Sequence, residues 1–357
     1  FALCTFGSLS IAWGQAENAP GDEAGADARG AIILASIAGD VKVLVNGKKD
    51  PDGNPVYLPN ADVKVNASIF DGHTVITGNA KGSSAILLFS NGTVTTLKED
   101  SELNIRGFKQ TKFEANDKKL SELEEEPSAS KTDINLNFGD MVVDIKKLSE
   151  DSTFDIESPV GTAGIRGTTV SLGVRPAPGG GFTGTFVVPK GLIAFTPPRP
   201  IPTIEVPNPP EPAPIPVAAG EVIEPSAPQR PPANAPLKPA AEVVQAPPPA
   251  PPKAAPPAIL QAATETVAVA VQTTAEVTLD TVSAAVVEVE AKAPPPEEAP
   301  APEETPDDAP DDAPDENPDD APDDAPDDAP DDAPDDAPDD APDDAPDDNP
   351  DSPDDNP

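Results

Sequence analysis

Hydrophobic and polar residues alternate through the first half of the chain. Between residues 32 and 195 the dominant period is two, as in Val41, Val43 and Val45 or in the stretch from Ile134 to Phe138. This period is typical of strands that bury one face. About a dozen such short runs predict an all-β fold. Periodicity alone does not distinguish among a sandwich, a barrel and a solenoid.

Turn residues separate these runs, and one insertion interrupts them. Asn-Gly between apolar runs favours a tight hairpin, because both residues tolerate a positive φ. The polar stretch 114–131 breaks the rhythm of the strands, and its part Lys118–Glu126 predicts a short charged helix on the surface. The turn signals are Asn46-Gly47, Asp52-Gly53, Asp71-Gly72, Asn91-Gly92 and the glycines of residues 179–181.

The distribution of aromatic residues and prolines sets the expected boundaries of the β domain. Every Phe, Tyr and Trp lies at or before Phe195, whereas 42 of the 51 prolines follow Thr196. A proline-rich segment without aromatics buries too little apolar surface to offset its backbone entropy. We therefore predict a β domain over residues 32–196, preceded by a flexible leader over residues 17–31.

The second half of the chain divides into three compositional segments. Residues 197–258 are proline-rich and predict an extended linker. Residues 259–292 are rich in Ala and Val, with valines at both helical and alternating spacing; their Ala content favours a marginal helix that becomes ordered on a partner. Residues 293–357 carry an Asp-Asp-Ala-Pro repeat, in which recurrent proline excludes helix and sheet, and predict a long disordered tail.

The negative charge is concentrated in this second half. Of the net charge of −41, −34 lies after Thr196. A polyanion repels nucleic acid and anionic lipid surfaces, so we expect neither as a partner. A tight calcium site needs about six to eight oxygen ligands on a loop that glycine permits. The tail has no glycine, and we expect it to associate only weakly and diffusely with divalent cations.

The first 16 residues resemble part of a secretory signal peptide. The stretch Phe1–Trp13 is apolar and uncharged and is followed by Gly14, Gln15 and Ala16, as at a small-residue cleavage site. Thirteen residues are too few to span a bilayer; the alternative is a buried strand or helix. We expect an exported protein, periplasmic or at the cell surface, with no transmembrane span. Cys4, the single cysteine, excludes a disulfide framework.

The chain offers few groups for catalysis. His73 is the single histidine, which excludes triads that need a histidine and metal sites with several; we expect it to be exposed. Asp151 and Asp155 read as solvated charges, and Ser83-Ser84 has no candidate base nearby. We predict no catalytic, cofactor-binding or metal site and no cofactor, and hence no enzyme. A two-carboxylate glycosidase site is the remaining enzymatic alternative.

Five stretches, in order, resemble the FecR-type domain. They are residues 39–43 (GDVKV), 72–78 (GHTVITG), 82–105 (GSSAILLFSNGTVTTLKEDSELNI), 138–143 (FGDMVV) and 153–170 (TFDIESPVGTAGIRGTTV). The resemblance extends over roughly residues 36–196 and implies a periplasmic β domain, solenoid-like or a twisted sheet. The best-known members relay the state of an outer-membrane iron-siderophore transporter to a cytoplasmic sigma factor. The sequence shows neither their cytoplasmic segment nor their transmembrane helix, which argues against direct sigma-factor regulation.

Within the last stretch, three glycines are spaced three residues apart. Gly161, Gly164 and Gly167 suit close backbone turns between strands better than a phosphate-binding loop, because no helix pattern follows them. Arg166 is expected to form a fold contact with Asp155 or Glu157.

These observations support two hypotheses of function. The first is an exported, non-enzymatic binding or signalling protein whose FecR-like β domain contacts a protein or an envelope component. The second is a structural surface or matrix protein in which the acidic repeat is the functional element.

Overall fold

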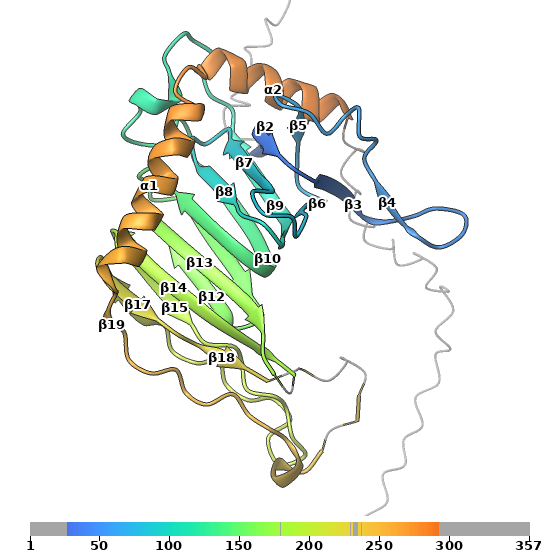
Figure 1. Ribbon diagram of the computed structural model, residues 1–357, viewed down its shortest axis with the longest axis vertical. Helices are drawn as coiled ribbons and strands as arrows, with labels where there is room; N and C mark the ends of the chain where they lie inside the picture. The colour runs from blue at the N-terminus through green and yellow to red at the C-terminus, as the bar shows by residue number, and fades with distance from the viewer. Residues whose placement is uncertain (1–26, 179, 229, 231–234, 237, 293–357) are drawn as a thin grey trace, which may run out of the picture. The chain divides into compact units, whose positions relative to one another are not determined.

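The computed structural model describes residues 27–292, apart from residues 179, 229, 231–234 and 237. The predicted signal peptide and the acidic repeat at residues 293–357 lie outside the described residues. Two β-sheets that share one long strand build the fold, and two helices pack on the second sheet (Figure 1). The predicted all-β fold class is confirmed in that strands predominate, with two helices added, and the β structure is open.

The first sheet extends on both sides of β9 (Ser101–Thr111). One edge of β9 pairs with β6 (His73–Thr77) and, further along, with β1 (Asp27–Arg29), while the other edge pairs with β10 (Ser130–Asp144). The strand order is β4 (Pro55–Tyr57), β3 (Val41–Lys49), β6, β9, β10, β11 (Thr153–Ser158), β12 (Gly161–Ile165), β15 (Leu192–Thr196) and β16 (Ile215–Ala218).

The second sheet is assembled around the other half of β10. Its strand order is β5 (Ser68–Ile69), β2 (Ile32–Ala38), β7 (Ser84–Phe89), β8 (Val94–Leu97), β10, β13 (Thr169–Pro176) and β14 (Phe182–Lys190). Strand β14 then pairs with both β17 (Glu221–Ile223) and β18 (Ser226–Ala227), and β17 pairs with β19 (Lys253–Ala254).

Strand β10 passes from one sheet into the other at a bulge. Residues up to Phe138 pair with β9, whereas residues from Gly139 onward pair with β8 and β13. The register shifts between Leu136 and Phe138, and Gly139 has a φ of 110°. A bulge bends its strand, so this point lets one strand serve both sheets. Among the described strands, only β10 and β11 pair in parallel.

The hydrophobic core lies between the two sheets. Alternate residues of β9 and β10 are buried, as the period of two predicts. Their inward side chains meet those of β7, β13 and β14. Aromatic rings anchor this layer: Phe89 contacts Phe108 and Phe154, and Phe186 contacts Phe195.

The turn signals are confirmed where they join neighbouring strands. Asn91-Gly92 connects β7 to β8, and Gly92 adopts a φ of 85°. Asn46-Gly47, in contrast, lies inside β3, where the register with β4 is irregular between Leu44 and Lys49. The positive φ of Gly47 therefore distorts a strand and does not end it.

The β fold extends beyond both expected boundaries. Ala31, in the expected leader, is fully buried, and β1 pairs with β9. The expected linker supplies β16 to β19, and Val217 and Ile223 join the main core. The prediction that residues 197–258 form a spacer is therefore wrong for these strands. Pro216 is accommodated because β16 is the last strand of its sheet.

The Ala- and Val-rich segment forms α1 (Pro257–Thr273) and α2 (Leu279–Lys292). The helical prediction is confirmed, and the partner of these helices is the same chain. Their buried side chains, including Ala270, Val282 and Val289, pack on Ile33, Leu88 and other residues of the outer face of the second sheet. Figure 1 shows both helices lying along that sheet.

The insertion at residues 114–131 docks on the connection between the two helices. Its only helical turn is the 3-10 turn Leu120–Glu122, so the prediction of a charged helix over Lys118–Glu126 is wrong. The Leu120 amide donates to the Val277 carbonyl at 2.9 Å, and the Leu279 amide donates to the Lys118 carbonyl at 3.0 Å. These backbone bonds, together with the burial of Leu120, replace intrahelical bonds.

Candidate functional site

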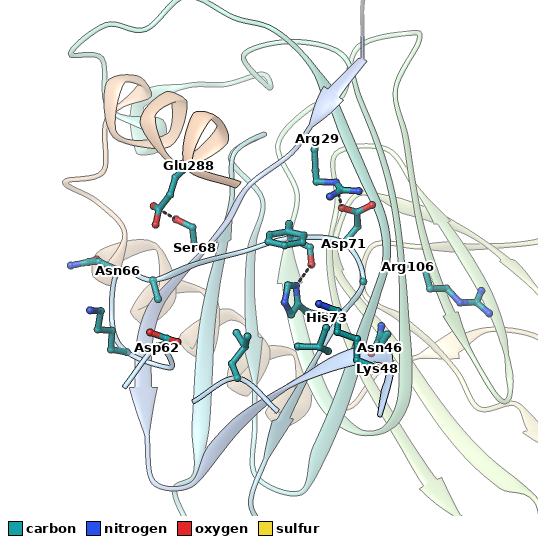
Figure 2. A pocket seen from close by; sticks show the side chains of 16 residues that line it. Arg29, Asn46, Lys48, Asp62, Asn66, Ser68, Asp71, His73, Arg106 and Glu288 are labelled. Atoms are coloured by element: carbon teal, nitrogen blue, oxygen red, sulfur yellow. Dashed lines mark hydrogen bonds and ion pairs between the residues drawn. The ribbon is translucent and has the colours of Figure 1, made fainter. Parts of the chain in front are cut away.

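A cavity of about 650 Å³ opens beside the N-terminal end of β6. Its walls come from β1, β3, β6 and β9 of the first sheet, from β5 and the connections before and after it, and from α2. The volume falls within the range of pockets that hold small ligands. Figure 2 shows the side chains that line it.

His73 lies at the inner wall of this cavity. It is only 4% exposed, so the prediction of an exposed histidine is wrong. The turn before it is tied into the sheet, because the Gly72 amide donates to the Ile105 carbonyl at 2.8 Å. His73 consequently begins β6 inside the sheet, paired with Val45 on β3 and Ile105 on β9.

The protonation state of His73 follows from its surroundings. Burial lowers the pKa of His73; its contact with the Phe70 carbonyl and the charge of Asp71 act in the opposite direction. Its Nδ1 lies 3.0 Å from the Phe70 carbonyl oxygen. A carbonyl only accepts hydrogen bonds, so Nδ1 carries the proton and donates. The lowered pKa favours the neutral ring, whose Nε2 is then the acceptor.

An ion pair and an aromatic ring complete this wall. The Arg29 Nε lies 2.8 Å from an oxygen of Asp71, and the Arg29 guanidinium stands 5.3 Å from the centre of the Phe70 ring. The Phe70 ring meets His73 edge to face, with centroids 4.4 Å apart. Burial raises the pKa of Asp71, and the charge of Arg29 opposes that rise. Asp71 and His73 are thus engaged by neighbours of the same chain.

Side-chain hydrogen bonds fix the polar rim on the first sheet. The Thr74 hydroxyl donates to the Asn46 side-chain oxygen at 2.6 Å, and the Asn46 amide nitrogen donates to Asn104 at 2.8 Å. The first bond links the neighbouring strands β6 and β3, and the second reaches from β3 across β6 to β9, so both lower the conformational freedom of their partners. The cavity is therefore preformed along this side.

The remaining charged residues of the cavity lie on two walls. One wall is the first sheet, and the opposite wall is formed by the connection between β4 and β5 together with α2. Lys48 is exposed on β3, and Arg106 on β9 forms an ion pair with Glu157. Asp62 and Lys64 are exposed on the connection between β4 and β5. Glu288 of α2 accepts a hydrogen bond from Ser68 at 3.3 Å.

Outside the cavity, three carboxylates gather on the first sheet. Asp133 pairs in register with Asp155, and Glu157 is close enough to raise the pKa of both. Burial is the largest cause of both rises. Asp155 therefore neighbours Asp133, whereas Asp151 is exposed. In the part of the chain that the structure describes, no group of three or more His, Cys, Asp or Glu side chains is placed to hold a metal ion.

The other residues singled out from the sequence serve the fold. Arg166 is exposed, and it is Arg106 that pairs with Glu157. A side chain at Gly161 would approach the Phe195 ring to 2.5 Å, which supports the expected close backbone approach. Ser83 is buried against Gly39. Among the described helices, none is long and apolar enough to cross a membrane.

The residues that shape the cavity were largely missed from the sequence. Arg29 falls in the expected leader and Glu288 in the expected partner-dependent helix, two segments for which the sequence predicts no site. A local sequence feature that lies in the site is Asp71-Gly72-His73, where a turn precedes the single histidine. The sequence predicts an exposed turn at this position, because it does not show which distant segments cover the turn.

The architecture described so far defines a twisted two-sheet β domain with a ligand-sized cavity. Residues 73–183 match the family model described as FecR protein. The resemblance found in the sequence is therefore confirmed over these residues, which match the FecR domain model. The match runs from β6 to β14 and begins at the histidine of the cavity; the stretch 39–43 lies outside it.

Two solved structures are similar to this chain at a low level. Both come from Parabacteroides distasonis ATCC 8503 and are described as a "putative anti-sigma factor", with 11% identity and TM-scores of 0.29 and 0.27. Each likeness covers 42% of this chain and 53% of the other, so this chain spans about half the length of those structures. Scores this low support no inference about function. No curated protein matches the chain.

Proposed function

We propose that this chain is an exported, non-enzymatic binding or signalling protein whose FecR-like domain recognises a protein or an envelope component. The observation that carries the proposal is the FecR match over residues 73–183, within a fold that holds a preformed cavity. The apolar, uncharged start of the chain is typical of an export signal and supports the proposed periplasmic or extracellular location.

The state of the polar groups in the cavity favours binding over catalysis. His73 donates to a backbone carbonyl, Asp71 pairs with Arg29, and the Ser68 hydroxyl donates to Glu288. A general base must reach the proton that it removes, and a nucleophile needs an adjacent base. Here each of these three side chains already has a structural partner in the chain.

A capture experiment tests which part of the protein makes the contact. The full chain and a chain ending at Pro296, where the first compact unit ends, are immobilised and exposed to envelope extracts. We expect both to retain the same partners. Retention only by the full chain would contradict the proposal and favour a structural protein whose acidic repeat binds.

Export is tested separately by cell fractionation. A tagged protein expressed with its native upstream sequence should be found in the periplasm, in the outer envelope or in the medium. Recovery in the cytoplasm alone would contradict the proposed location.

A further inference from the structure

We propose that the cavity beside His73 binds an extended peptide segment of a partner protein. The segment would have an apolar centre, an acidic group at the end facing the first sheet and a basic group at the other end. This inference rests on the proposed function, because it assigns the binding surface and the chemistry of its partner.

The opposite charges of the two cavity walls determine which end of the proposed peptide is acidic and which is basic. The first sheet contributes the cations Arg29, Lys48 and Arg106, against the single carboxylate of the adjoining turn, Asp71. The opposite wall contributes the carboxylates Asp62 and Glu288 against one cation, Lys64. In Figure 2, Arg29, Lys48 and Arg106 lie on the opposite side from Asp62 and Glu288. Complementary charge fixes the orientation of a ligand.

Two of these groups are best placed to select the ends of the peptide. Arg29 is paired with Asp71, and Arg106 is paired with Glu157, so their charges are partly compensated. Lys48 and Asp62 are exposed at opposite walls. We therefore assign the acidic end of the peptide to Lys48 and the basic end to Asp62.

The surface between the charged walls suits aliphatic side chains. Val45, Leu58 and Ala67 line it together with Phe70. The Phe70 ring contacts His73 at one place and the Arg29 guanidinium at another. A sugar ring binds best on an open aromatic face, which these contacts restrict. Neutral glycans also leave the charges of both walls without counterparts, so a peptide fits better than an oligosaccharide.

The binding surface needs the folded chain and is already ordered. Its residues come from four strands of the first sheet, from β5 and the connections before and after it, and from α2. The hydrogen bonds from Thr74 to Asn46 and from Asn46 to Asn104 hold the sheet side in place. A preformed site reduces the entropy that binding costs.

Binding of defined peptides to the full chain tests the inference. The probes are fluorescein-labelled, blocked hexapeptides of the pattern Gly-Glu-X-X-Lys-Gly and its reverse, where X is a mixture of Ala, Val, Leu, Ile and Phe. A third pool carries Gln in place of both charged residues. Fluorescence polarisation at low salt should show saturable binding of at least one charged pool. The Gln pool should bind about tenfold more weakly, because it loses both charge pairs and each exposed pair contributes modestly to binding.

Matched charge reversals show whether the cavity is the site. Lys48→Glu should weaken binding of the charged pool by about tenfold, since an attraction becomes a repulsion. Lys49→Glu is the control, because Lys49 is exposed on the same strand and does not line the cavity. Replacing the peptide glutamate by lysine should restore binding to the Lys48→Glu chain. Circular dichroism confirms that both variants are folded.

Several results would overturn the inference. These are equal binding by the Lys48→Glu and Lys49→Glu chains, no saturable binding of either charged pool, or binding of tri-N-acetylglucosamine where no peptide binds. Both variants also enter the envelope capture experiment. If they capture partners as the unchanged chain does, the proposed function stands and the cavity assignment fails. If the unchanged chain captures none, the proposed function itself fails.

Discussion

His73 shows how the burial and protonation of a side chain depend on distant segments that cover it. The sequence places it after a polar turn, yet Arg29, Phe70 and Lys48 surround it in the fold. Its neutral ring hydrogen-bonds to the backbone of the chain and braces the Phe70 ring. At this scale, His73 is a positioning residue for the cavity.

Burial of His73 predicts a loss of stability in mild acid. The unfolded histidine takes up a proton near pH 6.5, and burial lowers the pKa in the folded state. Below pH 6.5 the unfolded chain binds more protons, so the free energy of unfolding falls by at most about 1.4 kcal/mol per pH unit from this group. This contribution is fully present above pH 6.5.

Urea unfolding at pH 7.5 and 5.5 checks this prediction against His73→Asn. An asparagine amide can still donate to the Phe70 carbonyl, but it does not titrate. Asp71, Asp133 and Asp155 have raised pKa values and act in the opposite direction, since the folded chain takes up their protons first. Asp133 and Asp155 contribute equally in both proteins, whereas Asp71 interacts with His73, so the difference reports His73 together with its coupling to Asp71. Equal losses of stability in the two proteins would contradict the account.

The neighbouring carboxylates of the first sheet predict a stabilising substitution. Burial and the like charges of Asp133 and Glu157 both disfavour the Asp155 carboxylate, and side-chain pairs on neighbouring strands typically change stability by about 0.2–1 kcal/mol. Asp155→Asn should therefore raise the free energy of unfolding at pH 7 by about that amount. The exposed Asp151→Asn is the control and should change it little.

The pH dependence of this gain has a defined sign. The pKa of Asp155 is raised in the folded state, so its penalty is present above that pKa and disappears as pH falls toward 3.8. The advantage of Asp155→Asn should shrink accordingly on acidification. A destabilised variant at pH 7 would show that Asp155 has a favourable partner.

Gly161 predicts a backbone-specific loss of stability. Its φ is 141°, and an added Cβ would lie 2.5 Å from the Phe195 ring and 2.6 Å from the Thr196 carbonyl oxygen. Gly161→Ala should cost about 2–4 kcal/mol from strain and overlap together. Gly53, with a φ of 86° and open space around it, is the control, and Gly53→Ala should cost about 1–2 kcal/mol. Equal losses in thermal unfolding would show that the contact at Phe195 is absent.

At the scale of elements, the helices α1 and α2 are structural parts of the domain. Their apolar residues cover one face of the second sheet, and their connection is bonded to the insertion at residues 114–131. Moderate helix propensity alone does not stabilise segments of this length, since isolated short helices are marginal in water. Packing on the sheet supplies the missing stability.

A pair of equivalent substitutions in α2 tests this packing. Val282 is fully buried and Val287 is 63% exposed. Val282→Ala should lower the free energy of unfolding by about 1–3 kcal/mol through lost burial and a cavity. Val287→Ala should be neutral or slightly stabilising, because alanine has the higher helix propensity. Urea unfolding followed by circular dichroism gives both values; equal effects would place the helix off the sheet.

At the scale of the whole molecule, the sequence predicts the first part of the fold better than the rest. Long alternating runs such as those of β9 and β10 carry a clear period, and the FecR-like stretches lie in order along them. The strands β16 to β19 are only two to four residues long, and β16, β18 and β19 directly follow a proline, so they show no period. These strands are buried because they pair with edges that the earlier strands leave open. The sequence of the short strands alone does not show that pairing.

The cavity, like the short strands, is not predictable from the local sequence. Asp71 and His73 were visible in the sequence as a polar turn with a rare residue type. Arg29, which pairs with Asp71, lies 44 positions before His73, and Glu288 lies on a helix near the end of the described chain. Charges brought together over such separations leave no local pattern. A site of this kind becomes apparent only when the sheets and helices are assembled.

Completion of the β domain by residues after Thr196 underlies the fold, the cavity and the proposed partner surface. Hydrogen exchange of the full chain measures this most directly. We expect the amides of β17 and of the buried turns of α2 to exchange slowly and to open together with those of β7 and β10. Fast exchange at every amide after Thr196, beside a protected first sheet, would contradict the account.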